Sequence, residues 1–453
     1  MRSMLLPFFF LAVLPGVAQY GAGIAGGTYE GVWGLGSQPA SILLNPVKVE
    51  INIHRTGVDL DNTYLHLDQQ EIGLFGFGRR IRVDTSDAAL GPTLSSRRSV
   101  SLDVRSMLPS FSLRIGTNNA IAFTNNIRAT LTALDLNELA RKFGIDAISL
   151  DPGTSRRMEE LKVLSAAMSW TEHGITYGHT FQMNERVRLH SALTGKYVIG
   201  IYGMYIDNQA PLLSGINDSV QVVSEVNADY AIVYPPSDLW STGLGGMMNG
   251  QGWGMDAGAV IEWMRDDTAT ATPYWLRIGA AITDVGSINY TKRSEVHEIR
   301  NGVASTDEID EFEIEEPIQL GSALSELFLN DPNASLRGRS FRMVLPMAVH
   351  ASVDYCPVRN FALRLETIFG LTEPTSGTTA RNQLSIVPRY EIRNFSLAIP
   401  ITMDEYAEAS MGLSIRIAGF MIGSDRIGGL VGLNSVSGAD LYFGMKVRIK
   451  GKS

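Results

Sequence analysis

The last stretch of the chain, residues 438–450, constrains the fold more than any other. Every second residue from Ala439 to Ile449 is apolar, and the residues between them are polar, charged or glycine. Because side chains alternate across a strand, the two sets lie on opposite faces of one extended segment. A soluble half-buried strand gives this pattern too. Its repetition along most of the chain, with charges on the second face, instead favours a closed barrel with lipid outside and water inside.

The N-terminus has the pattern of a secretory signal. Arg2 precedes an apolar run at residues 5–14, and Gly16-Val17-Ala18 forms a small-x-small cleavage site. A membrane anchor is the alternative, but this run is about half of the roughly 20 residues that a spanning helix needs. No later run reaches that length either. We therefore expect residues 1–18 to be a signal peptide. An exported chain without spanning helices is either soluble outside the inner membrane or a barrel in an outer one, and the repeated alternation favours a barrel of a Gram-negative outer membrane.

Composition and motifs argue against several other classes of protein. The chain has a formal net charge of −9, whereas a nucleic-acid-binding protein needs a basic surface. Cys356 is the single cysteine, which excludes an internal disulfide or a multi-cysteine metal site. Residues 21–26 match G-x-G-x-x-G, but a dinucleotide site needs a strand before this motif and a helix after it. The carboxylates of residues 307–316 could suit Ca²⁺, although without EF-hand spacing a solvated loop is favoured. We predict no cofactor, no metal and no nucleic-acid partner.

The remaining pattern predicts an all-β, closed antiparallel transmembrane barrel of about 14 strands, at residues 47–453. We expect turns at Glu172-His173, Asn184-Glu185 and residues 283–286, a glycine-rich loop at residues 243–254, and short helices within long loops, at residues 135–143 and within 317–329. Strands are expected at residues 49–64, 71–78, 100–115 (interrupted at Pro109), 121–133, 164–170, 175–183, 187–201, 220–234, 257–263, 275–285, 341–355, 361–369, 384–390, 395–401, 411–417 and 439–449.

The charged faces of these strands supply the residues that we expect to face the lumen. They mix both signs, which favours paired charges crowding the lumen over a single-sign ion filter. The predicted inward residues are Arg186, Arg188, His190, Lys196, Glu262, Arg342, His350, Asp354, Arg364, Glu366, Arg389, Glu391, Arg416, Asp440, Lys446 and Arg448. Residues 19–46 are glycine-rich and show no regular spacing of apolar residues. We expect them to fold back into the barrel lumen as a hatch.

Five short stretches carry a resemblance to a known family: Gln38-Pro39-Ala40, residues 170–178, Gly195-Lys196-Tyr197, residues 282–288 and residues 440–444. They resemble an uncharacterised outer-membrane family. It is related to the long-chain fatty-acid channel (FadL-like) barrels and to porin-like partners of the type IX secretion system. The resemblance implies fourteen strands and an N-terminal hatch, with Gln38-Pro39-Ala40 in the place of the Asn-Pro-Ala of fatty-acid channels.

Two functions follow as hypotheses. The first is a hatch-plugged channel for small apolar molecules. The second is a non-conducting envelope scaffold or secretion-associated barrel, motivated by the long connections at residues 134–162 and 300–340, since binding concentrates in long loops. Outer-membrane lipid, small apolar ligands and envelope proteins are the expected partners. An enzyme is disfavoured because the sequence has neither G-x-S-x-G nor H-E-x-x-H, so we predict no catalytic residue.

Overall fold

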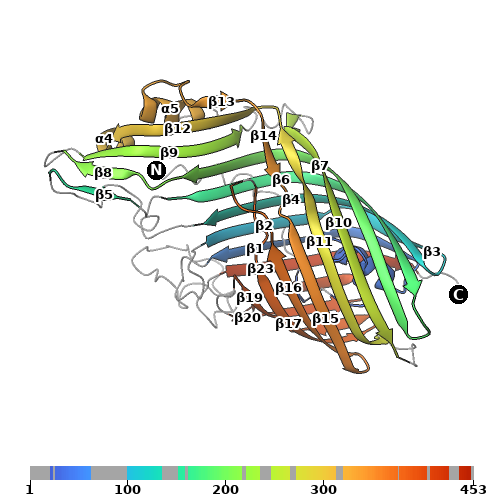
Figure 1. Cartoon of the computed structure of the whole chain (residues 1–453). Helices are drawn as coiled ribbons and strands as arrows, with labels where there is room; N and C mark the ends of the chain where they lie inside the picture. Colours follow the sequence, from blue (N-terminus) through green and yellow to red (C-terminus); the bar gives the residue numbers. More distant parts are fainter. Residues whose placement is uncertain are drawn as a thin grey trace, which may run out of the picture.

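The computed structural model describes most of the chain as one antiparallel sheet closed into a barrel (Figure 1). The described residues are 21–23, 26–62, 99–134, 152–158, 162–216, 221–234, 246–265, 272–312, 320–375, 377–405, 409–427 and 438–449. The expected signal peptide, the strand at residues 71–78 and the helix at residues 135–143 lie outside them. No helix within these ranges is long and apolar enough to cross a membrane.

Fourteen strands form the barrel, as predicted. In four places two consecutive short elements make up one strand. In order around the barrel they are β1 (Val49–Asn62), β2 (Ser99–Met107) with β3 (Ser110–Ile115), β4 (Asn119–Leu134), β6 (Leu164–Gln182), β7 (Val187–Asn208), β10 (Gly250–Met264), β11 (Tyr274–Tyr290), β14 (Phe341–Val344) with β15 (Ala348–Val358), β16 (Phe361–Gly370), β17 (Gln383–Ile392), β18 (Phe395–Ala398) with β19 (Ile401–Asp404), β20 (Ala409–Met411) with β21 (Leu413–Ile417), β22 (Phe420–Ser424) and β23 (Gly438–Ile449).

Pairing of the last strand with the first closes the barrel. Val49 lies opposite Ile449, and the ladder continues to Asp61 opposite Gly438. One end of the barrel has short turns and the start of β1 and end of β23, whereas the other end has the long connections. We call these the short-turn end and the long-loop end.

A smaller sheet projects from the long-loop end, at the upper left of Figure 1. Its strands are β5 (Ser155–Arg157), β8 (Leu212–Gly215), β9 (Gln221–Val233), β12 (Ser294–Ser305) and β13 (Leu336–Gly338). It continues the barrel because the last residues of β7 pair with β9. The helices α4 (Thr306–Asp310) and α5 (Leu320–Leu329) accompany β12, and α5 confirms the short helix expected before Asn330.

Residues before β1 include a 3-10 turn, η1 (Gly31–Gly34), and one helical turn, α2 (Ser41–Leu44). Gly31 has a φ of 52°, and a Cβ there would collide with the Glu50 carboxylate. Both conditions favour glycine. We refer to residues 21–23 and 26–47 as the N-terminal segment.

Three expectations about strand ends are wrong. β6 runs unbroken through Glu172-His173, β11 runs through residues 283–286, and β10 begins at Gly250 inside the expected glycine-rich loop. Asp284 has a φ of 59°, and the β10–β11 register shifts nearby, between Met255 and Ala257. The turn-like sequence there marks a β-bulge, which shares the local geometry of a turn without ending the strand.

The interruption at Pro109 is confirmed, and a side chain seals it. β2 ends at Met107, β3 begins at Ser110, and β1 pairs with both. Asn52 Nδ2 donates to the carbonyl oxygens of Met107 (3.0 Å) and Leu108 (2.9 Å). The amide thus satisfies backbone acceptors where Pro109 breaks the ladder.

We expect Asn52→Ala to lower the free energy of unfolding by about 1–3 kcal/mol, because it leaves two backbone acceptors and the Trp33 indole N–H without their partner. Guanidinium unfolding in detergent micelles measures this. Asn394→Ala, in an exposed turn, is the matched control and should change stability by less than about 0.5 kcal/mol. Equal effects of both substitutions would contradict the sealing role of Asn52.

Candidate functional site: the filled lumen

The inside of the barrel is the candidate site, and most predicted lumen residues are buried there. Twelve of the sixteen are buried, namely His190, Lys196, Glu262, His350, Asp354, Arg364, Glu366, Arg389, Glu391, Arg416, Asp440 and Lys446. Arg188 and Arg448 are half-buried at the short-turn end, and Arg186 is exposed in the turn before β7.

Arg342 is exposed and belongs to the outward face. Residues 345–347 separate β14 from β15, so the inward face passes from the odd-numbered Met343 and Leu345 to the even-numbered Ala348 and His350. A single alternation over residues 341–355 therefore placed Arg342 inside and Met343 outside, and both placements were wrong.

Buried charges near the short-turn end form a belt across neighbouring strands. Glu262 on β10 accepts from Arg277 Nε on β11 at 2.7 Å and lies 3.2 Å from His190 Nε2 on β7. The Arg277 guanidinium stacks over the Tyr274 ring, 3.6 Å from its centroid. Tyr274 in turn donates to Asp354 at 3.1 Å. The belt thus passes from β7 to β15 through alternating donors and acceptors.

The same belt continues around the wall to β21. Asp354 accepts from Arg389 on β17 at 3.0 Å, and Glu391 accepts from Arg416 on β21 at 3.3 Å. Each of these side chains is nearly inaccessible to solvent. Removing the charge of one member of such a pair leaves the other member buried and uncompensated. The two members of each pair therefore depend on one another.

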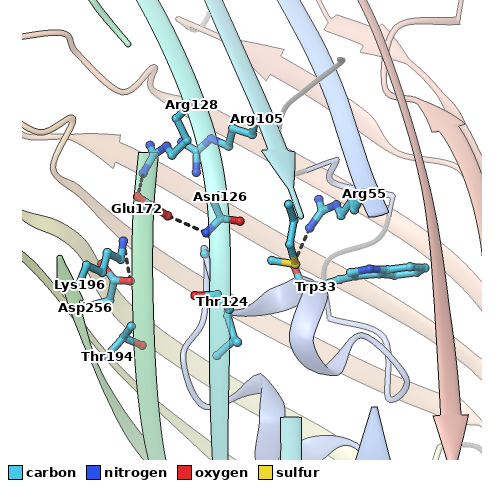
Figure 2. A pocket seen from close by; sticks show the side chains of 13 residues that line it. Trp33, Arg55, Arg105, Thr124, Asn126, Arg128, Glu172, Thr194, Lys196 and Asp256 are labelled. Atoms are coloured by element: carbon cyan, nitrogen blue, oxygen red, sulfur yellow. Dashed lines mark hydrogen bonds and ion pairs between the residues drawn. The ribbon is translucent and has the colours of Figure 1, made fainter. Parts of the chain in front are cut away.

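A second network lies deeper, on strands β4 to β11. Arg128 Nη1 contacts Glu172 at 3.3 Å and Asp284 at 2.8 Å, and Lys196 Nζ contacts Asp256 at 2.8 Å and Asp284 at 2.7 Å. Figure 2 shows four of these residues converging beside the N-terminal segment. Glu172 and Asp284 were missed from the sequence because both stand in predicted turns.

The network lines a small cavity of about 40 Å³. An apolar cavity on the order of 150 Å³ is needed to hold a benzene-sized molecule, whereas this one is charged and has room for water. The cavity as it stands is therefore not a site for an aromatic ligand. Its lining also includes Trp33, Leu35, Gly36, Arg55, Arg105, Met107, Thr124, Asn126 and Thr194.

The N-terminal segment contacts the inside of the wall on several sides. The backbone amides of Ala22 and Thr28 donate to Asp425 (2.5 Å) and Glu391 (3.0 Å), and Val32 N donates to Glu50 (2.7 Å). Three acceptors on β1, on β17 and just after β22 thus hold one short segment.

Gln38 binds a fourth part of the wall. Its Nε2 donates to the carbonyl oxygens of Ala259 (3.3 Å) on β10 and Ala280 (3.2 Å) on β11. A Cβ at Gly258 would collide with the Gln38 amide, so the glycine makes room for it. Pro39 lies against the same glycine, and Ala40 is fully buried. Gln38-Pro39-Ala40 therefore lies in the lumen.

Charges of the wall also bind the middle of the segment. Lys446 Nζ contacts Glu50 at 2.7 Å and donates to the carbonyls of Tyr29 and Glu30, both at 2.7 Å. Trp33 lies 4.0 Å beneath this ammonium group. Burial raises the pKa of the Glu30 carboxyl, whose Oε2 accepts from Gly26 N at 2.8 Å.

A second segment enters the lumen from the opposite end. Residues 371–375 and 377–382, the inward loop, connect β16 to β17. Thr378 Oγ1 accepts from Thr130 on β4 at 2.7 Å, and Thr379 N donates to Thr132 at 3.3 Å. The fully buried Thr378 thus reaches a strand on the far side of the barrel from β16 and β17. Arg381, in the same loop, pairs with Asp59 on β1.

Apolar side chains fill the lumen near the inward loop. Ala166, Met168 and Trp170 form the apolar face of the strand expected at residues 164–170, and apolar faces were expected to meet lipid, but all three are buried inside the barrel. They share the inward face with Glu172 and Thr176, because β6 has no turn at Glu172-His173. This apolar cluster comprises Ala166, Met168, Trp170, Val198, Val233, Ile288, Tyr290, Met343 and Leu345.

One histidine of the projecting sheet has the neighbours of a catalytic triad. His297 Nδ1 lies 2.8 Å from Ser335 Oγ, and its Nε2 lies 3.2 Å from Glu295. Ser335 is fully buried, and burial lowers the pKa of His297. The Ser335 backbone N also binds Ser325 on α5 at 3.0 Å. A substrate cannot reach this serine, so the network serves to hold α5 on β12.

We expect Lys196→Met to destabilise the barrel by about 3–5 kcal/mol, because it leaves Asp256 and Asp284 buried without their shared cation. Adding Asp256→Asn removes one uncompensated charge and should recover part of the loss. Guanidinium unfolding of the single and double variants measures the recovery. A double variant less stable than Lys196→Met would show that the two residues do not act as a pair.

Comparisons with other proteins concern the family and the barrel. A model of the family of unknown function DUF5723 matches residues 39–425. No curated protein sequence is similar to the chain. Solved structures with a similar fold include FadL-type channels, the group that the sequence resembles, and this likeness concerns the barrel alone.

Three of these structures illustrate the likeness. A deltaS2S3 mutant of the monoaromatic hydrocarbon channel TodX is 10% identical, with 93% of this chain and 95% of that chain covered and a TM-score of 0.41. A FadL homologue of Pseudomonas aeruginosa is 11% identical, with 96% of each chain covered and a TM-score of 0.40. The toluene transporter TodX of Pseudomonas putida is 9% identical, with 92% of each chain covered and a TM-score of 0.38.

Proposed function

The chain belongs to the family of unknown function DUF5723, and we propose that it is an integral barrel of a bacterial outer membrane whose lumen is closed by its own N-terminal segment. In this proposal, small molecules pass only when that segment moves, and apolar molecules are the cargo class. The observation that carries the proposal is that the N-terminal segment binds inward-facing groups on several sides of the barrel.

The outer surface supports the membrane location. Large apolar side chains are exposed on strands all around the barrel, whereas a soluble monomer rarely exposes a contiguous apolar patch larger than a few hundred Å². A band of this kind, outside a barrel with a charged interior, suits contact with lipid. Examples are Ile51, Phe111, Ile175, Leu193, Ile261, Ile278, Val353, Leu363, Leu365, Ile386, Ile401, Ile417, Ile422 and Val447.

Contacts of the N-terminal segment support its role as a hatch. They are hydrogen bonds to side chains and to two backbone carbonyls of the wall, not a shared strand ladder, so the segment can leave without breaking the barrel. The inward loop supports a second closure at the long-loop end, because it reaches from β16 and β17 to β4. The apolar cluster beside this loop supports an apolar cargo, since movement of the loop would open hydrophobic surface inside a charged lumen.

A non-conducting scaffold is the second candidate. The charged side chains that fill the lumen favour it, because buried ion pairs across neighbouring strands leave little space for a solute. The projecting sheet favours it as well, since it presents β-structure beyond the barrel to other proteins. A scaffold of this kind would stay closed whatever is removed from its lumen.

We expect deletion of residues 19–46 to raise single-channel conductance in planar bilayers, because it removes the segment that binds β1, β10, β11 and β17. Replacing residues 373–379 with a glycine-serine linker in the same variant should raise the conductance further. The linker replacement alone is the matched control and should have a small effect, because the N-terminal segment stays in place. A doubly altered, correctly folded barrel without conductance would reject the channel and leave the scaffold.

Cargo class is tested separately. Cells that carry the protein should take up a labelled small aromatic compound faster than a deletion strain, because the proposed passage bypasses the outer leaflet. The variant lacking residues 19–46 should restore uptake at least as well as the unaltered chain. Equal uptake by all three strains would reject apolar cargo without bearing on the hatch.

We expect Leu365→Arg to destabilise folding into lipid vesicles by about 2–4 kcal/mol, because Leu365 lies mid-strand on the outward face. Val303→Arg is the control, since Val303 is similarly exposed but lies on β12 of the projecting sheet. This substitution should reduce the folding free energy by less than about 1 kcal/mol. The measurement is urea-dependent folding into vesicles. Equal costs would argue that this face of β16 does not contact hydrocarbon.

A further inference from the structure

The short-turn end of the barrel carries a concentration of positive charge. Its described turn and strand-end residues include one acidic side chain, Glu185, apart from the carboxylates buried one layer further in. Two more, Asp266 and Asp267, belong to the connection between β10 and β11 and lie outside the described residues. The cations, which we call the basic mouth, are Lys48, Arg114, Arg186, Arg188, Arg265, Arg359, Arg393 and Arg448. The chain as a whole has a net charge of −9, so this end has the opposite sign.

Several of these guanidinium groups are held by neutral acceptors. Arg114 donates to the backbone oxygens of Leu43 (3.2 Å) and Asn45 (2.8 Å). Arg448 donates to the backbone oxygen of Ala418 at 2.8 Å. A backbone carbonyl fixes the direction of a guanidinium group but does not cancel its charge.

The next layer inward is arranged differently. There Lys446 faces Glu50, Arg277 faces Glu262 and Arg389 faces Asp354, all within 3.0 Å. By contrast, the ion pairs of the described residues include none with Lys48, Arg114, Arg188, Arg265, Arg393 or Arg448. The positive charge at the rim is therefore a property of the arrangement and not of composition alone.

At least three of the cations face the mouth of the lumen. Arg188 is two residues from the buried His190, Arg448 is two residues from the buried Lys446, and Arg114 is two residues from the buried Ser112. Residues two apart in a strand share a face, so these arginines lie on the inward side of the wall. Lipid headgroups beside the barrel would meet the outward side. A partner for these charges would come from the water over the mouth.

We propose that the basic mouth is a docking surface for an acidic segment of a water-soluble protein. Carboxylates are the natural partners of guanidinium groups, which they bind with two parallel hydrogen bonds. A ring of like charge also attracts an oppositely charged partner over roughly a Debye length, about 10 Å at 0.1 M salt. In an outer membrane the short turns of a barrel face the periplasm, so the partner would be periplasmic. The proposal does not depend on passage through the lumen.

The test uses the full-length barrel in nanodiscs of zwitterionic lipid, with a short fluorescent glutamate-rich peptide as the probe. We expect the peptide to bind, as measured by fluorescence anisotropy, and the affinity to fall by at least roughly tenfold between about 0.1 M and 0.5 M salt because the attraction is screened. A lysine-rich peptide of the same length should not bind. Equal binding of the two peptides would overturn the proposal.

Charge-neutralising variants locate the site. The variant Arg114→Gln, Arg188→Gln, Arg393→Gln, Arg448→Gln should weaken binding by at least roughly tenfold, because each carboxylate contact to a charged group is lost. The matched control removes the same number of charges from the projecting sheet and should leave binding unchanged. It carries Arg156→Gln, Arg157→Gln, Arg300→Gln and Arg337→Gln.

A variant with only two substitutions controls for misfolding. Arg114 and Arg448 hold backbone carbonyls, so their loss could disturb the fold, whereas Lys48 and Arg393 are exposed. Lys48→Gln with Arg393→Gln should still weaken binding severalfold. The proposal fails if this variant binds the peptide as well as the unaltered chain does. It also fails if the projecting-sheet control loses as much affinity for the peptide as the mouth variant. It also fails if the mouth binds anionic phospholipid, detected by native mass spectrometry, and no peptide.

Discussion

Pairing of buried charges across strands is the interaction on which the rest of the structure depends. Strand alternation turns one side chain in two toward the lumen, and many of those side chains are charged. A buried carboxylate costs several kcal/mol unless a cation and hydrogen bonds compensate it. Glu262 meets Arg277, Asp354 meets Arg389 and Asp284 meets both Arg128 and Lys196. Each pair joins different strands, so the network fixes the register of the wall as it fills the interior.

The N-terminal segment binds through the same groups. Glu391 pairs with Arg416 and also accepts from the Thr28 amide, and Lys446 pairs with Glu50 while donating to Tyr29 and Glu30. Segment and wall therefore share acceptors and donors. Because the wall groups already have partners in the wall, removal of the segment leaves them paired. This arrangement suits a part that can be displaced, and it separates the stability of the barrel from the occupancy of its lumen.

The sequence predicts the architecture well and the site only in part. Alternation over residues 438–450, repeated along the chain, is sufficient for a closed barrel and for most inward charges. The alternation rule fails where the inward-facing side chains are apolar instead of charged. Met168 and Trp170 are apolar and face inward, because the lumen near the long-loop end is packed with side chains instead of water. Asp284 lies in a bulge that reads as a turn. Which cation meets which carboxylate depends on register, and register is a long-range property that local patterns do not contain.

The two layers at the short-turn end separate the structural charges from those available for binding. Inside, Arg389 and Lys446 each face a carboxylate, so their charges are neutralised within the folded protein. At the rim, Arg114 and Arg448 are oriented by carbonyl oxygens and keep their charge. Stability alone does not require this outer layer to be positive, since polar uncharged side chains could cap the same carbonyls. A charge that the fold orients but does not neutralise can act on whatever approaches the mouth.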